Sequence, residues 1–389
     1  MLLPEKLGTI KTPAYVLDER ALTHNLEKIA YIRAATGIKI ILATKAFSMF
    51  QVFPLMRNYL DGTTASGYYE ARLGHAEFGK EVHVYSPAFE EAEVAKIIPL
   101  ADHITFNSVR QFRKFYPEIK TKKPSLSPGI RINPGISLVE SSLYNPSGLY
   151  SRMGSLKKHI DGETLALIEG LHFHNLCENM ENDSIKLIDF VAENYRDWLK
   201  KVKWVNFGGG HFINHPDYNS EKLIARLIAF RADYPELEVI LEPGGGIVYD
   251  TGYLVASVVD IVENDKQIAI LNTSATTHMP DVLEMPYRPP LYDSGMPDEK
   301  GYNYILAGKT CLTGDVIGEY SFDKPLSIGD KLIFTEMMQY TMVKNTTFNG
   351  MPLPDIAVLR ENGSYDILKS FGYEDFMERL GSVRNLLPQ

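Results

Sequence analysis

Two ionisable side chains of opposite charge directly follow short apolar segments that are typical of buried strands. Lys45 follows Ile-Ile-Leu-Ala-Thr, and Glu242 follows Glu-Val-Ile-Leu. A lysine beside apolar walls has a destabilised ammonium and can act as an amine nucleophile, although a lysine that simply reaches solvent is the commoner case. A carboxylate in such a place is costly unless it meets a cation or a protonated ring nitrogen, and a structural arginine is the alternative partner.

Two glycine-rich segments also follow apolar runs. Gly208, Gly209 and Gly210 come after Trp-Val-Asn-Phe, and Gly244 and Gly245 come just after Glu242. Glycines let the backbone approach an anion closely, so that its N–H groups can bind a phosphate. One glycine run is equally typical of a tight turn, but two on neighbouring strands favour a phosphate site.

Histidines and cysteines are few. His172 and His174 end another apolar run, where alternation places both on one face. A metal site there is a weak hypothesis, and a core or ring-stacking histidine is favoured. Cys311 lies between turn signals, where a lone cysteine is most often a small buried hydrophobe. With Cys177 it makes only two cysteines, too few for a disulfide framework or a thiolate metal site.

Eight short apolar runs alternate with helix-like segments over the first 250 residues. The expected strands are 38–43, 62–66, 82–86, 103–106, 129–132, 168–174, 202–207 and 238–241. The clearest expected helices are 69–78, 90–100, 184–198 and 220–234. This alternation predicts an α/β fold with a parallel sheet, closed as a (β/α)8 barrel, with a doubly wound open sheet as the competing architecture.

The pattern changes after about Asp250. Segments 253–262, 267–271, 302–306, 331–335 and 338–343 are typical of strands between Pro/Gly-rich turns. The N-terminal run Pro13-Ala-Tyr-Val-Leu also predicts a strand that pairs with them. We therefore expect a barrel over 19–250 and a mostly-β domain made of 1–18 and 251–389, with no predicted structure for 279–302.

The bulk composition excludes some classes of partner. The 389-residue chain has a formal net charge of -9, which disfavours nucleic acid and anionic membranes because both need a cationic surface. No apolar run approaches the ~20 residues that span a bilayer, and the N-terminus lacks a signal-peptide layout. A cytoplasmic location is the default expectation.

Together these motifs resemble the alanine-racemase-like, fold-type III decarboxylases that use pyridoxal 5'-phosphate (PLP). The resemblance covers most of the chain, and within the family it is nearest to the carboxynorspermidine/carboxyspermidine decarboxylase branch. The matching segments are Thr12-Pro-Ala-Tyr-Val-Leu, Ala43-Thr-Lys45-Ala, Ala65-Ser-Gly-Tyr-Tyr-Glu70, Gly129-Ile-Arg131-Ile-Asn-Pro, His172-Phe-His174, Phe207-Gly-Gly-Gly210, Glu242-Pro-Gly, Cys311, Gln339-Tyr340-Thr and Phe348-Asn-Gly.

The resemblance implies a PLP barrel, a β-domain from both termini, no metal, and a homodimer whose active sites lie at the subunit interface. It implies that Lys45 holds the cofactor covalently, that His174 stacks on its ring, and that Glu242 meets its pyridine nitrogen. The remaining implied roles are phosphate binding by Gly208, Gly209, Gly210, Gly244 and Gly245, support by Glu70 and Arg131, and contributions from the partner subunit by Cys311 and Tyr340, the latter near the phosphate.

The chain departs from the family pattern at several positions. Gly245 stands where many relatives carry arginine, and Cys177 where relatives have a serine that bonds the phosphate. Leu312 follows the catalytic cysteine, where ornithine and diaminopimelate decarboxylases have an acidic residue. This favours a different, longer substrate, with Asp315 left to meet an amine and Glu242 and Tyr340 also expected near the substrate.

The resemblance therefore implies decarboxylation of carboxynorspermidine and carboxyspermidine to norspermidine and spermidine in polyamine biosynthesis. Alternatives are a diaminopimelate or ornithine decarboxylase, or an amino-acid racemase, which would need a second acid/base on the opposite face. A non-catalytic regulatory protein and a metal-dependent hydrolase built on His172 and His174 are further alternatives. The hydrolase would need carboxylate and histidine partners that the sequence does not reveal.

Overall fold

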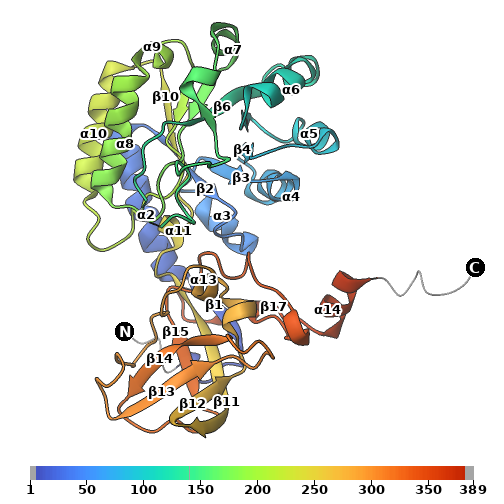
Figure 1. The fold of residues 1–389 in the computed structure, drawn as a ribbon, viewed down its shortest axis with the longest axis vertical. Coiled ribbons are helices and arrows are strands. Elements are labelled where there is room, and N and C mark those ends of the chain that lie inside the picture. Colours follow the sequence, from blue (N-terminus) through green and yellow to red (C-terminus); the bar gives the residue numbers. More distant parts are fainter. Residues whose placement is uncertain (1–5, 140, 382–389) are drawn as a thin grey trace, which may run out of the picture. The chain divides into compact units, whose positions relative to one another are not determined.

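The computed structural model describes residues 6–139 and 141–381 (Figure 1). These residues form two compact units. One is Thr23–Tyr249, and the other joins the residues up to Leu22 to those from Asp250 onward. Among the described residues, no helix is both long enough and apolar enough to cross a membrane.

Within the first unit, the described residues contain eight parallel strands that close on themselves. Hydrogen bonds between β5 and β6 complete the circle, with His103 opposite Ser127 and Phe106 opposite Ile130. The structure therefore confirms the barrel and rejects the open sheet. Its strands are β2 (Lys39–Ala43), β3 (Gly62–Ala65), β4 (Glu81–Ser86), β5 (His103–Phe106), β6 (Ser127–Asn133), β8 (Gly170–His172), β9 (Trp204–Asn206) and β10 (Glu238–Leu241). The two-residue β7 (Ser155–Leu156) pairs with the end of β6.

Helices surround the barrel in the upper part of Figure 1. Several begin at a side chain that caps the first turn: Ser108, Asp161 and Asn219 each accept a hydrogen bond from the backbone N–H three residues on. The helices are α2 (Glu19–Thr36), α3 (Phe53–Met56), α4 (Tyr68–Leu73), α5 (Glu91–Ile97), α6 (Val109–Lys122), α7 (Gly162–Leu167), α8 (Glu181–Asn194), α9 (Arg196–Leu199), α10 (Ser220–Asp233) and α11 (Gly245–Val248). The segment expected as one helix over 184–198 is divided at Tyr195.

The second unit is built on a sheet in which β1 (Ala14–Asp18) lies between two strands from the C-terminal part of the chain. It pairs antiparallel with β11 (Gly252–Asn264) and parallel with β16 (Asp355–Leu359). This confirms that the N-terminal strand belongs to the β-domain. The other strands are β12 (Lys266–Leu271), β13 (Tyr302–Ala307), β14 (Val316–Phe322), β15 (Lys331–Phe334) and β17 (Tyr365–Lys369), and the helices are α12 (Ala275–His278), α13 (Asp281–Glu284) and α14 (Tyr373–Leu380).

One predicted strand, 338–343, is wrong. This segment consists of bends and turns, and Tyr340 has a positive φ of 52°, which a strand does not accommodate. Its apolar character has another origin, because Met338 is fully buried against Gly252 of β11. Strands β14, β16 and β17 were not expected from the sequence.

In the barrel interior, one large side chain packs closely against glycines of two other strands. The Trp204 indole on β9 lies against Gly170 of β8 and Gly129 of β6, and its Nε1 donates to Ser127 Oγ at 2.8 Å. A Cβ added to Gly170 would lie 1.9 Å from the indole ring. The small residues on two strands are therefore required by the large ring on a third.

We expect Gly170→Ala to destabilise the barrel by about 1–3 kcal/mol because the added methyl overpacks the Trp204 ring. Gly162→Ala is the matched control, since a Cβ there meets nothing within 4 Å. The urea midpoint of each variant, followed by tryptophan fluorescence, measures the effect. Equal midpoints for the two variants would contradict this account of the packing.

Candidate functional site

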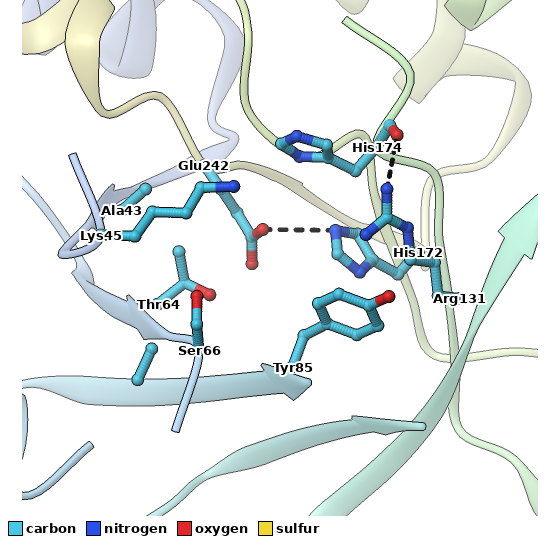
Figure 2. Close-up of a pocket in the computed structure, with 10 residues that line it drawn as sticks. Ala43, Lys45, Thr64, Ser66, Tyr85, Arg131, His172, His174 and Glu242 are labelled. Carbon is cyan, nitrogen blue, oxygen red and sulfur yellow. Dashed lines mark hydrogen bonds and ion pairs between the residues drawn. The ribbon is translucent and has the colours of Figure 1, made fainter. Parts of the chain in front are cut away.

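A cavity lies at the carboxyl ends of the barrel strands (Figure 2), where active sites of such barrels are found. Its lining brings together four residues that the sequence predicted, Lys45, Arg131, His174 and Glu242. Figure 2 shows the Lys45, His172 and Glu242 side chains turned into the same space. The other lining residues are Ala43, Thr64, Ala65, Ser66, Tyr85 and His172.

Glu242 is a buried carboxylate, with 6% of its surface exposed, and both of its oxygens have partners. Asn206 Nδ2 donates to Oε1 at 2.7 Å, and His172 Nε2 lies 3.2 Å from Oε2. Burial by itself raises the pKa of Glu242, but His172 and Asn206 outweigh it and lower the pKa to about 2. The side chain is therefore an anion at neutral pH, as a partner for a protonated ring nitrogen must be.

Lys45 follows β2, and its side chain, which is exposed to solvent, turns into the cavity. Desolvation by the protein atoms around the ammonium lowers the pKa of Lys45, and the positive charge of Arg131 lowers it further. The carboxylates of Glu242 and Glu70 oppose this shift without reversing it. A larger fraction of the amine is therefore neutral, and hence nucleophilic, than for a lysine at the surface.

His174 is held by its backbone and its ring. Arg131 donates from Nη2 to the His174 carbonyl at 2.9 Å, and Gly209 N donates to His174 Nδ1 at 2.8 Å. The Arg131 guanidinium in turn lies over the Tyr85 ring, 4.7 Å from its centroid. Burial and the charge of Lys45 hold the pKa of His174 well below its ordinary value, so the ring is neutral and suited to stacking on an aromatic cofactor.

Glu70, on α4, binds one residue of the cavity lining and one next to it. Its Oε2 accepts a 2.6 Å hydrogen bond from the Ser66 N–H and a 3.2 Å hydrogen bond from Thr44 Oγ1. Thr44 immediately precedes Lys45, and Ser66 lines the cavity. Glu70 therefore joins the segments that follow β2 and β3, and its role in supporting a cofactor stays a prediction.

The two glycine segments come close to other backbone in ways that a side chain would prevent. Gly208 and Gly210 have positive φ values of 71° and 85°. A Cβ on Gly209 would lie 2.5 Å from the Glu242 carbonyl oxygen, and one on Gly244 would lie 2.6 Å from Ala46 Cβ. Helix α11 begins just after Gly244, and the first N–H groups of a helix have no acceptor inside it. The N–H groups of Gly208 and Gly209 donate to Asn206 Oδ1 and His174 Nδ1, and phosphate binding by the two segments stays a prediction.

Three groups thus surround one cavity: an amine with a lowered pKa, a permanent carboxylate and a neutral imidazole. With the glycine segments beside them, they fit a flat aldehyde cofactor that carries a phosphate and a basic ring nitrogen. Cys177 lies next to the glycine run, since its backbone N would be 2.7 Å from a Cβ on Gly210.

The second unit contains the other predicted site residues. Cys311 is exposed in the turn between β13 and β14, and Asp315 is buried at the end of the same turn. Tyr340 is half-buried in the turn segment after β15. Their place against the barrel cavity stays a prediction.

Sequence reasoning missed two side chains that organise the cavity. Asn206 ends β9 and binds Glu242, and Tyr85 lies near the end of β4 under Arg131. The available signal was their position at the ends of predicted strands, where polar side chains reach the site. Asn206 also directly precedes Phe207 and the glycine run.

The histidine pair has a carboxylate partner that the sequence did not reveal. Ligand atoms of His172, His174 and Glu242 lie within 4.8 Å of one another, so the three could approach one metal ion. The structure thus removes one argument against a metal site. However, His174 Nδ1 already accepts a hydrogen bond from the Gly209 N–H. The cavity also contains Lys45, and a metal hydrolase does not require a lysine amine.

Comparisons with known proteins agree with a PLP site. The family model described as pyridoxal-dependent decarboxylase, C-terminal sheet domain, matches residues 14–338. The chain is 44% identical over 381 residues to the carboxynorspermidine/carboxyspermidine decarboxylase of Campylobacter jejuni, covering 95% of this chain and 98% of the relative. It is 41% identical over 377 residues to the carboxyaminopropylagmatine decarboxylase of a Synechocystis species, covering 97% of both chains.

Solved structures show the same relationship. The crystal structure of carboxynorspermidine decarboxylase complexed with norspermidine from Campylobacter jejuni has a TM-score of 0.87 and 43% identity, covering 95% of this chain and 100% of that one. Diaminopimelate decarboxylase from Helicobacter pylori, at 17% identity, shares the fold with a TM-score of 0.81 and covers 97% of this chain. By its sequence and its fold, the chain belongs to the family of pyridoxal-dependent decarboxylases, enzymes that use PLP as their cofactor.

Proposed function

We propose that this chain decarboxylates carboxynorspermidine and carboxyspermidine, releasing carbon dioxide and forming norspermidine and spermidine in polyamine biosynthesis. One observation carries the proposal: Lys45 and Glu242 share a cavity in a chain that is 44% identical, along nearly its whole length, to a relative of that activity. A second relative with that name, from Herminiimonas arsenicoxydans, is 37% identical over 95% of the chain.

PLP, when bound, accepts the electron pair that carbon dioxide leaves behind. Glu242 keeps a negative charge beside the ring nitrogen, where a charge-assisted hydrogen bond holds that nitrogen in its protonated form. Lys45 supplies the amine that holds the cofactor and yields it to the amine of the substrate. The lowered pKa of Lys45 favours both the binding of the cofactor by Lys45 and its transfer to the substrate amine, because the neutral amine is the reacting form.

We further propose that His174 stacks on the cofactor ring and that the segments Gly208–Gly210 and Gly244–Gly245 hold its phosphate. The Gly209 N–H already donates to His174 Nδ1, so the same segment orients the ring-stacking residue. Arg131 holds the His174 backbone through a hydrogen bond to its carbonyl. The ring and the phosphate are thereby positioned by one continuous set of contacts.

The remaining steps involve the β-domain. We propose a homodimer in the cytoplasm in which Cys311 and Tyr340 complete the active site of the partner subunit. There Cys311 delivers a proton to the α-carbon after carbon dioxide has left, and Tyr340 lies near the phosphate. The net charge of -9 favours a cationic polyamine over nucleic acid or an anionic membrane.

A second candidate substrate is carboxyaminopropylagmatine. The relative that bears this activity is 41% identical, close to the 44% of the first relative. Agmatine ends in a guanidinium, whereas norspermidine and spermidine end in ammonium groups. The cofactor chemistry would be the same for all three, so only the recognition of the distal group distinguishes them.

Release of carbon dioxide from a panel of substrates tests the proposal directly. With PLP present, we expect turnover of carboxynorspermidine and carboxyspermidine, with kcat/KM values within about 10- to 200-fold of each other, since one methylene contributes only about 1–3 kcal/mol. Ornithine and diaminopimelate are the negative controls. A preference for carboxyaminopropylagmatine would make it the substrate in place of the two carboxy-polyamines. Turnover of ornithine or diaminopimelate alone would overturn the proposal.

Lys45→Ala should abolish turnover and remove the visible absorbance of covalently held PLP, because no other amine is expected to replace it in the cavity. Lys158→Ala, at an exposed position, is the matched control and should keep both properties. The visible absorbance of imine-linked PLP and carbon dioxide release are the two measurements. A normal spectrum in Lys45→Ala would refute the assignment of the cofactor-bearing residue.

Glu242→Gln should lower kcat by about 10²–10³-fold, since it removes a preorganised charge, while PLP affinity falls much less. The exposed Glu236→Gln is the matched control. Because the pKa of Glu242 is lowered to about 2, the wild-type carboxylate stays ionised until the pH falls well below 4.5, its ordinary value. Any loss of wild-type activity between pH 7 and pH 5, as a rough window, must therefore come from another group. Equal kcat in Glu242→Gln and wild type would exclude the electronic role.

A further inference from the structure

The turn that contains Cys311 spans residues 308–315, between the antiparallel strands β13 and β14. It has no helix or strand of its own, and Cys311 is exposed. A thiol on such a turn delivers a proton to one defined atom only if the backbone beneath it is held in place. The contacts of this turn show which residues hold it.

Asp315 is the first of these residues. Only 3% of its surface is exposed, and its oxygens accept hydrogen bonds from two hydroxyl groups. Ser274 Oγ lies 2.9 Å from Oδ1 and 2.8 Å from Oδ2, and Thr310 Oγ1 donates to Oδ2 at 2.6 Å. The backbone N–H groups of Thr310 and Thr276 add weaker bonds of 3.3 Å. The carboxylate therefore ties the residue before Cys311 to the start of α12.

The turn is also closed on itself. Gly308 N donates to the Asp315 carbonyl at 2.9 Å, and Asp315 N donates to the Leu312 carbonyl at 2.9 Å. A Cβ at Gly308 would lie 2.2 Å from Asp315 Oδ2, so the carboxylate reaches Thr310 only because residue 308 has no side chain. The geometry of the turn thus depends on the position of the Asp315 side chain.

Asn349 holds the turn from the other side. Its Oδ1 accepts a 2.7 Å hydrogen bond from the backbone N–H of Cys311 itself. Asn349 has a positive φ of 56°, a conformation that asparagine, aspartate and glycine adopt more readily than other residues. Two adjacent residues, Thr310 and Cys311, are therefore fixed by different side chains, Asp315 and Asn349.

We propose that Asp315 and Asn349 are positioning residues that fix the Cys311 backbone for proton delivery. This inference rests on the proposed function of Cys311. It replaces the expectation that Asp315 meets an amine of the substrate, since both oxygens of the buried carboxylate are engaged by Ser274 and Thr310. The thiol stays free to react, while the peptide that bears it does not move.

Asn349 offers a matched pair of variants at an exposed position. Asn349→Gly keeps the left-handed backbone and loses the acceptor, whereas Asn349→Asp keeps both. Hydrogen exchange of the peptide covering residues 308–315 should be about fivefold faster in Asn349→Gly, the effect of losing one hydrogen bond of ~1 kcal/mol, and close to wild type in Asn349→Asp. Asp315→Asn should also accelerate exchange, because the new NH2 group cannot accept a hydrogen bond from whichever backbone N–H, that of Thr310 or of Thr276, faces it.

Kinetics with carboxynorspermidine test the consequence for catalysis. We expect kcat to fall about fivefold in Asn349→Gly with KM and the absorbance of bound PLP unchanged, and to be restored in Asn349→Asp. Unchanged exchange in Asn349→Gly would overturn the proposal, as would faster exchange with wild-type kcat. A wild-type kcat in Cys311→Ala would also overturn it, because the turn would then hold no proton donor.

The same experiments separate this inference from the proposed function. If wild-type enzyme releases no carbon dioxide from any carboxy-polyamine, the proposed function fails. Exchange in the two Asn349 variants then decides by itself whether the side chain fixes the turn. Equal exchange in both variants would reject that role whatever the substrate is.

Discussion

Burial of the Glu242 carboxylate at the end of the barrel is the constraint on which the site depends. A carboxylate without partners in such a place would cost several kcal/mol or take up a proton. The structure meets this requirement with side chains from two neighbouring strands, His172 on β8 and Asn206 on β9. Because parallel strands β8, β9 and β10 are adjacent, their carboxyl ends bring these three residues together. The pairing of these three parallel strands is therefore what allows the charge to exist there.

The partners of Glu242 also organise the rest of the cavity. Asn206 uses its amide N–H for Glu242 and its carbonyl oxygen to accept from Gly208 N at 2.8 Å. The next N–H, of Gly209, donates to His174, whose carbonyl accepts from Arg131. One hydrogen-bonded chain thus links the residue expected at the ring nitrogen to the segment expected at the phosphate. A displacement at either end would be transmitted to the other through short, directional contacts.

Buried carboxylates serve different purposes in the two units. Glu242 has an imidazole and an amide as partners, and it keeps its charge toward an open cavity. Asp315 is surrounded by hydroxyl and backbone N–H donors that use both of its oxygens. The first arrangement keeps a charge at the wall of a cavity, and the second stabilises a turn. Both side chains are carboxylates, so the difference between the two sites comes from the groups that surround each carboxylate.

Much of the fold follows from local sequence. Apolar runs bounded by polar residues predict all eight barrel strands, since burial of a parallel strand on both faces leaves that pattern in the sequence. Lys45 and Glu242 were identifiable because each directly follows such a run. The wrong strand at 338–343 shows the limit of this signal. Met338 is buried by packing against Gly252 rather than by pairing in a sheet, and a local apolar pattern does not distinguish the two.

Partners distant in the chain were decided only by the tertiary structure. Ser274 and Asp315 are separated by 41 residues, and Asn206 and Glu242 by 36. The parallel pairing of β1 with β16 likewise joins the two ends of the described chain. Such contacts are set by strand order and register, which bring side chains within hydrogen-bond distance whatever their separation in sequence. The sequence by itself thus determined the chemical groups and the strands that hold them, and the order and register of the strands decided which groups meet.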